Sequence, residues 1–219
     1  MVQQPKISFR EEAEWLGDWH PLVDQLGSTQ GLVTLSAVSR QLQLRRVQDL
    51  STLRDFLEAY QTHVLVPIEL PAIQRAFLHA SRNQTRELIA EDQQIAREPL
   101  LREFAAASQR VGQCHLRRLR PLRDHRLLQR YLLAVEEGRA FGWHTLVYGI
   151  TISIYSLPVR QCLVFYERKT LSGFIHSAAR ALKLSEMESR GLLQELCADL
   201  PESLDGEMRS AYGEPAGRD

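Results

Sequence analysis

Three short patterns follow one another in the second half of the chain. They are His144-Thr-Leu-Val-Tyr148-Gly149, Ser156-Leu-Pro158 and Ser177-Ala178-Ala179-Arg180. Small side chains in the third pattern let a neighbouring backbone approach closely, and Arg180 offers a planar fork of hydrogen-bond donors for a carboxylate or carbonyl. The stretch from His144 to Leu184 therefore predicts a core for packing and docking, and it is not typical of a reaction centre.

The segment between the first two patterns gives conflicting signals. Residues 145–155 (TLVYGITISIY) are rich in β-branched and aromatic side chains, which favour a strand by propensity alone. No other part of the sequence offers a strand to pair with, and an isolated strand leaves its backbone groups without hydrogen bonds. We therefore predict a helix that is buried on nearly all sides.

The rest of the chain is typical of helices. Apolar residues recur at helical spacing in most segments, and together they predict an all-α, single-domain bundle of about 8–10 helices. Ser8, Asp124 and Ser185 are placed to cap helices. An amphipathic helical stripe starts at Asp49 and Leu50, and Pro67 is expected to break that helix. The expected parts are an N-terminal helix and irregular segment (1–30), the helical domain (31–200) and a flexible acidic tail (201–219).

Composition sets the broad class of protein. The 219 residues carry no formal net charge, so the chain as a whole has no attraction to nucleic acid or anionic membranes. The N-terminus has no apolar core for a signal peptide, and no apolar run is long enough to span a membrane. Three cysteines cannot all pair, which favours reduced thiols and a cytoplasmic location.

Catalytic and metal-binding patterns are missing from the sequence. None of the seven histidines has a partner four residues away, the usual spacing of helical metal ligands. No nucleophile elbow and no glycine-rich phosphate loop is present. We therefore expect no enzymatic activity, no cofactor and no resident metal, and we interpret His144 as a helix-terminus or interface residue.

One charge cluster leaves an alternative open. Five arginines occur between residues 117 and 126, at Arg117, Arg118, Arg120, Arg123 and Arg126. They could bind phosphates, which would make the chain a helical nucleic-acid-binding protein. A solvated corner between two helices, facing acidic groups of this chain or of a partner, is the plainer interpretation. Without interleaved aromatic residues we rank nucleic acid second.

The order of these patterns resembles the urease accessory protein F (UreF) family, which is all-helical. That family has a His-x-x-x-aromatic-Gly step, then a Leu-Pro turn and a Ser-Ala-Ala-x-Arg-like step. Two further matches precede them, Glu69-Leu70-Pro71 and the small-residue pair Ser108 and Gly112. The resemblance covers residues 49–184. The N-terminal motif of the family, which is associated with partner docking, is reduced here to Gly27 and Leu35.

The resemblance implies a nickel-insertion chaperone without enzymatic activity. Such a protein is an adaptor that binds urease accessory protein D (also called H), recruits the nickel-carrying GTPase (accessory protein G) to the urease apoprotein and modulates GTP hydrolysis. It also implies a homodimer within the complex and an acidic tail that orders on partner binding. The positions expected to support partner binding are His144, Tyr148, Gly149, Ser177, Ala178, Arg180, Glu69, Pro71, Ser108 and Gly112.

Overall fold

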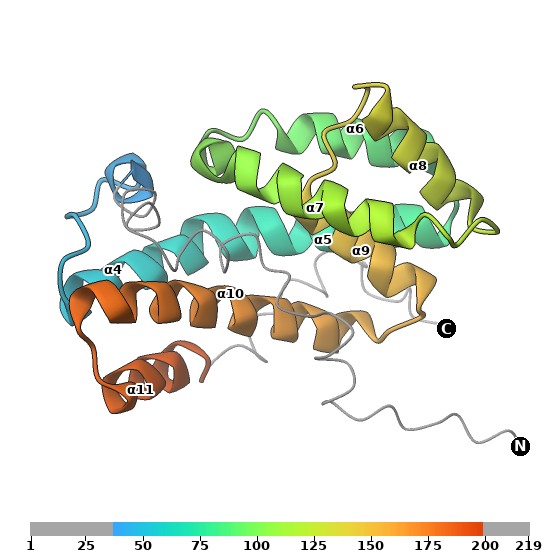
Figure 1. Cartoon of the computed structure of the whole chain (residues 1–219). Helices are drawn as coiled ribbons and strands as arrows, with labels where there is room; N and C mark the ends of the chain where they lie inside the picture. The colour runs from blue at the N-terminus through green and yellow to red at the C-terminus, as the bar shows by residue number, and fades with distance from the viewer. Residues whose placement is uncertain (1–36, 199–219) are drawn as a thin grey trace, which may run out of the picture.

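A computed structural model of the chain describes residues 37–198, and it is all-α, as predicted (Figure 1). No strand occurs within this described range. A short π-helix, η1, and a short 3₁₀-helix, η2, interrupt the α-helices. In chain order the elements are α4 (Leu50–Tyr60), η1 (Gln61–Glu69), α5 (Leu70–Ser81), α6 (Thr85–Ile95), η2 (Pro99–Phe104), α7 (Ala105–Leu119), α8 (Arg126–Glu136), α9 (His144–Ile154), α10 (Val159–Leu182) and α11 (Glu186–Leu196).

The prediction that Pro67 breaks the helix is wrong. The backbone stays in the right-handed helical conformation at both junctions, from α4 to η1 and from η1 to α5. Tyr60, at the first junction, and Glu69, at the second, both have right-handed helical torsion angles. Pro67 lies inside the π-helix. The wider π turn relieves the clash between a proline ring and the preceding turn, and proline's missing N–H costs one hydrogen bond without ending the helix. Proline does stand in the first turn of α5, at Pro71, as expected.

The predicted helix start at Asp49 and the predicted helix cap at Ser185 are both confirmed. The Asp49 carboxylate accepts a hydrogen bond from the Thr52 amide at 2.8 Å, and α4 begins at the next residue, Leu50. Ser185 and Glu188 form a reciprocal capping box at the start of α11. Both caps follow the same rule, since a side-chain oxygen satisfies an amide that has no partner inside the helix.

The predicted cap at Asp124 is wrong. Helix α8 begins one residue later than expected, with His125 at the capping position and no side-chain hydrogen bond there. The corner before α8 is instead stabilised by a side chain from within α8. The Gln129 side-chain amide donates to the carbonyl oxygens of Arg120 and Leu122, at 3.1 Å each. A later glutamine therefore stabilises the turn in place of the aspartate.

Helix α9 lies at the centre of the bundle, and the helix prediction for residues 145–155 is confirmed. It packs most extensively on α5 and then on α7, while α10 crosses the front of the molecule below α7 (Figure 1). Every residue from His144 to Ile152 is buried. A β-rich sequence forms a helix here because tertiary burial on all sides outweighs strand propensity.

An aromatic cluster closes the core on the α4 and α10 side. Its members, which lie 4.8–6.1 Å apart between ring centroids and mostly edge to face, are Phe56, Tyr60, Phe104 and Phe174. Such pairs add to the stabilisation that comes from buried apolar area. The helix predicted from Ser8, the motif remnants at Gly27 and Leu35, and the acidic tail 201–219 lie outside the described residues, so these parts stay predictions.

Candidate partner-docking site

Gly149 lets α9 approach α5 at backbone distance. A methyl group placed on Gly149 would lie 2.4 Å from the carbonyl oxygen of Ile73 and 3.0 Å from the amide nitrogen of Phe77. Both atoms belong to the backbone of α5, so they cannot turn away as a side chain would. The aromatic-Gly step of the sequence is therefore a helix-packing contact.

Ser108 and Gly112 make the matching contact on the other side of α9. A methyl group on Gly112 would lie 2.2 Å from the carbonyl oxygen of Gly142. One turn earlier in α7, the Ser108 hydroxyl accepts a hydrogen bond from the His144 amide at 3.1 Å. That amide belongs to the first residue of α9, where backbone donors lack partners inside the helix. Gly112 is confirmed as a close-contact point.

Asp92 of α6 holds the segment that leads into α9, and sequence reasoning missed it. Its side chain is fully buried and accepts hydrogen bonds from the Tyr131 hydroxyl at 2.5 Å and the Gly142 amide at 2.9 Å. The amides of Phe141 and Trp143 also donate to it. Burial raises the pKa of this carboxyl, and the four donors oppose that rise. Nothing in the local sequence distinguishes Asp92 from a solvated residue of a polar helix.

Glu69 is a buried carboxyl at the junction of η1 and α5. Its side chain lies near the phenols of Tyr60 and Tyr166, and its Oε2 has no hydrogen-bond partner among residues 37–198. Burial raises the pKa of Glu69 to about 7, and the nearby Tyr60 hydroxyl limits that rise by favouring the ionised form. Short π-helical turns inside α-helices are frequent at functional sites, and Glu69 is the last residue of such a segment.

His144 and Tyr148 extend this polar cluster from α9 toward α10. The rings of His144 and Tyr166 stack at 6.0 Å between centroids, and those of Tyr148 and Tyr166 lie 5.1 Å apart. The Tyr148 hydroxyl donates to the carbonyl oxygen of Cys162 at 2.9 Å. These contacts join the start of α9 to the first half of α10, so both residues position helices within the chain.

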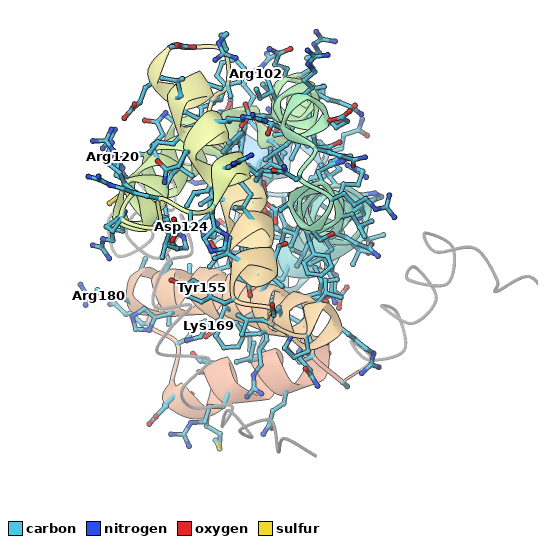
Figure 2. All side chains as sticks on the ribbon, turned by 90° about the vertical axis from the view of Figure 1, so that its right-hand side faces the viewer. Arg102, Arg120, Asp124, Tyr155, Lys169 and Arg180 are labelled. Carbon is cyan, nitrogen blue, oxygen red and sulfur yellow. The ribbon has the colours of Figure 1, made fainter. Side chains whose placement is uncertain are left out.

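Ser177, Ala178 and Arg180 lie in the last third of α10. The first two are buried, at 4% and 0% exposure. Arg180 is exposed, and its side chain projects from the same side of the molecule as that of Arg120 (Figure 2). The small residues let α10 pack closely, while the arginine two residues later reaches outward.

The ten residues expected from sequence therefore divide by burial. Arg180 is exposed and Pro71 is partly buried. The other eight are buried within the chain: Glu69, Ser108, Gly112, His144, Tyr148, Gly149, Ser177 and Ala178. They set the spacing of α5, α7, α9 and α10, so any role in partner binding would be to support a surface from below.

The arginine cluster lies at the corner between α7 and α8. Arg120 forms an ion pair with Glu136, which ties the corner to the far end of α8. Arg117, Arg123 and Arg126 are exposed and have no ion pair with any residue in the described range. Between residues 117 and 126 the corner carries no phenylalanine, tyrosine or tryptophan on which a base could stack, and its only aromatic ring is the exposed imidazole of His125.

Residues 37–198 contain neither a cluster of metal ligands nor a membrane-spanning helix. No group of three or more histidine, cysteine, aspartate or glutamate side chains between residues 37 and 198 could hold a metal ion. Over the same range, none of the helices combines the length and the apolar character needed to cross a membrane.

Comparison with known proteins connects this arrangement to one family. The model of the UreF family matches residues 47–197, which spans every helix from α4 to α11. A urease accessory protein UreF from Actinobacillus pleuropneumoniae is 23% identical over 133 residues, covering 61% of this chain and 59% of the relative. The chain thus spans about three fifths of the length of that relative. With most of its length matched by the family model, the chain belongs to the UreF family.

Proposed function

We propose that this protein is a urease accessory protein that works as an adaptor in nickel insertion, without catalytic activity of its own. The observation that carries the proposal is the family match over residues 47–197, together with the similarity to a urease accessory protein UreF from Actinobacillus pleuropneumoniae. The match takes in the whole helical body, including both glycine contacts that position α9.

In this role the chain binds urease accessory proteins D (also called H) and G and brings the GTPase to the urease apoprotein in the cytoplasm. It acts as a homodimer within that complex and modulates GTP hydrolysis. Nickel is cargo in this scheme. Arg180 supports the proposal as an exposed guanidinium that forms no ion pair within residues 37–198, next to the buried Ser177-Ala178 step. A guanidinium in that position suits a carboxylate or a backbone carbonyl of a partner.

The buried residues contribute indirectly. Gly149 and Gly112 fix α9 between α5 and α7, and the Glu69 and Tyr166 cluster joins α5 to α10. The position of α10, and of any partner that docks on it, would therefore depend on how α9 packs against its neighbours.

The proposal is tested by co-purification of the tagged, full-length chain with accessory proteins D and G from the same host. We expect both accessory proteins to be retained. Arg180→Ala should weaken their retention by roughly tenfold, because the loss of one charge-assisted hydrogen bond lowers the affinity by about that factor. The exposed, unpaired Arg97 supplies the matched control, Arg97→Ala. Absence of both accessory proteins from the intact chain would contradict the adaptor role.

A further inference from the structure

The charge of the chain is distributed unevenly, although its sum is zero. Residues 105–184 contain thirteen arginines and lysines against four acidic residues, a net charge of +9. The segment that follows α11 is the opposite. Residues 199–207 (DLPESLDGE) hold four carboxylates and no cation. The two segments are therefore complementary in charge.

Three of the four lysines and arginines of α10, Arg168, Lys169 and Arg180, lie along one side of the helix. They belong to a set that we call the α10 stripe; its members recur at helical spacing and are exposed or partly exposed: Phe165, Arg168, Lys169, Ser172, His176 and Arg180. Lys169 Nζ lies 5.5 Å from the centre of the Phe165 ring. The single carboxylate of α10, Glu167, is fully buried and cannot neutralise the stripe at the surface.

Nearby carboxylates of the described chain are already engaged. On α11, Glu195 pairs with Arg54, Glu186 pairs with Arg190, and Glu188 caps its own helix. None of the carboxylates in residues 37–198 forms an ion pair with Arg168, Lys169 or Arg180. The stripe therefore carries cations that the described part of the chain leaves without acidic partners.

The end of α11, from which the acidic segment continues along the chain, lies near Arg168 of this stripe. The Gln61 side chain donates to Glu167 Oε1 at 3.0 Å and to the Leu196 carbonyl oxygen at 3.5 Å, so the end of α11 lies against the residue that precedes Arg168. The Arg168 guanidinium also acts on the Cys197 thiol: burial raises the pKa of that thiol, and the guanidinium opposes the rise. Figure 1 shows α11 running below α10. Asp199 is only two residues beyond Cys197.

From this placement we propose that residues 199–207 dock on the α10 stripe of the same chain, with Asp199, Glu202, Asp205 and Glu207 facing Arg168, Lys169 and Arg180. Three residues of chain span at most about 11 Å, so the first carboxylate reaches Arg168 without any movement of α11. Nine extended residues span about 30 Å, whereas the helix between residues 168 and 180 is roughly 18 Å long. The segment is therefore long enough to reach from Arg168 to Arg180.

Tethering favours this occupant over a free acidic partner. A segment joined to its site by a few residues has an effective concentration in the millimolar range, so weak surface ion pairs suffice to hold it. Leu200 and Leu204 stand between the carboxylates and give the segment apolar side chains to place against Phe165.

Zero-length carbodiimide cross-linking of the full-length chain tests the proposal directly. The sequence has only three lysines, Lys6, Lys169 and Lys183, so carboxylate–lysine links are easy to assign by mass spectrometry. We expect links from residues 199–207 to Lys169 at low ionic strength, and a several-fold loss of these links in about 0.5 M salt, since exposed charges are screened there.

A pair of charge-reversed variants makes the test specific. The double change Arg168→Glu and Arg180→Glu keeps Lys169 in place and should reduce the link to Lys169 by roughly fivefold or more. The control reverses two exposed, unpaired arginines elsewhere, Arg97→Glu and Arg102→Glu, and should leave the link unchanged; Figure 2 shows Arg102 at the opposite end of the molecule from α10. Equal link yields in the two variants would overturn the proposal.

Isotope mixing separates docking within one chain from docking between chains. In a mixture of unlabelled and fully ¹⁵N-labelled protein, docking within the chain gives cross-linked peptides that are wholly light or wholly heavy. Peptides of mixed isotope in half of the linked population would show that the segment reaches a second copy, which overturns docking within the chain. The cross-linking result does not depend on which proteins the chain assembles with.

Discussion

Gly149 and Gly112 determine how closely α9 approaches its two neighbours. Each faces backbone atoms of the opposing segment rather than flexible side chains. Backbone atoms move only if a whole helix moves, so these two positions have little tolerance for added volume.

Replacement of Gly149 by alanine should destabilise the protein by about 1–3 kcal/mol, because the added methyl group would overlap the α5 backbone at Ile73. Urea unfolding followed by circular dichroism measures the effect. Gly191 on α11 is the matched control, since a methyl group there meets no atom within 4 Å. Gly191→Ala should be neutral or stabilise by up to about 1 kcal/mol through helix propensity. Equal losses of stability at both glycines would contradict the close-contact account.

The buried Glu69 gives stability a specific dependence on pH. Its folded pKa of about 7 exceeds the ordinary value of 4.5, so the folded state holds a proton that the unfolded state loses first. Stability from this group is therefore fully present below about pH 4.5 and is lost as pH rises through about 7. At roughly 1.4 kcal/mol per pKa unit, the loss is on the order of 3 kcal/mol.

Glu69→Gln should remove this pH dependence, because the amide cannot ionise. The free energy of unfolding of the wild type minus that of Glu69→Gln should fall between pH 5 and pH 8, as measured by urea titrations at several pH values. The exposed Glu103→Gln variant is the control. A wild-type-minus-variant difference that stays constant over this range would show that Glu69 is ionised in the folded protein.

At the scale of elements, α9 depends on a loop that Asp92 holds in place. This carboxylate accepts the amides of Phe141, Gly142 and Trp143 as well as the Tyr131 hydroxyl. One side chain of α6 thus joins the middle of α8 to the connecting loop and to the residue that precedes α9. The loop also carries the Gly142 carbonyl that lies against Gly112.

Asp92→Ala should cost about 2–4 kcal/mol, since it leaves several buried donors without an acceptor. Hydrogen exchange adds a local readout: the amide of Gly142 should lose protection more than amides in the middle of α10. Tyr131→Phe removes only one of the four donors and should cost clearly less. If the two variants lost the same stability, the amide contacts of Asp92 would contribute nothing.

Local sequence signals predicted the elements where one signal dominated. The capping pairs at Asp49 and Ser185 were predictable because a cap needs only neighbouring residues. Helix α9 was predictable only by elimination, from the lack of strand partners. The break at Pro67 was predicted wrongly because the rule for proline assumes α-helical hydrogen bonding, and this segment is a π-helix.

The candidate site was predictable only in part, because local sequence signals do not show contacts between residues far apart in the chain. Small residues at Ser108, Gly112 and Gly149 indicated close packing, and the structure places all three at backbone contacts of α9. Asp92 was not predictable, since its donors come from residues about 40 to 50 positions away. The sequence also did not indicate that Glu69 is buried, because the residues that cover it, Tyr60 and Tyr166, lie in separate helices.

At the scale of the whole molecule, the interior of α5, α7, α9 and α10 is rigid packing, and the features available to partners lie outside it. The α10 stripe, which includes Arg180, is exposed or partly exposed, whereas eight of the nine other sequence-matched residues are buried. A rigid core with an exposed charged surface suits an adaptor, because the core keeps the charged groups at a constant spacing. The proposed accessory role therefore depends on assembly with partner proteins and not on the chemistry of a single side chain.

Deletion of the gene in its host, followed by an assay of urease activity with and without excess nickel, tests this role most directly. We expect urease activity to be lost, to return with the intact gene, and to return only in part with Arg180→Ala. The Arg97→Ala gene should restore activity fully. Unchanged urease activity after deletion, in a host that uses urease, would contradict the accessory role of this protein.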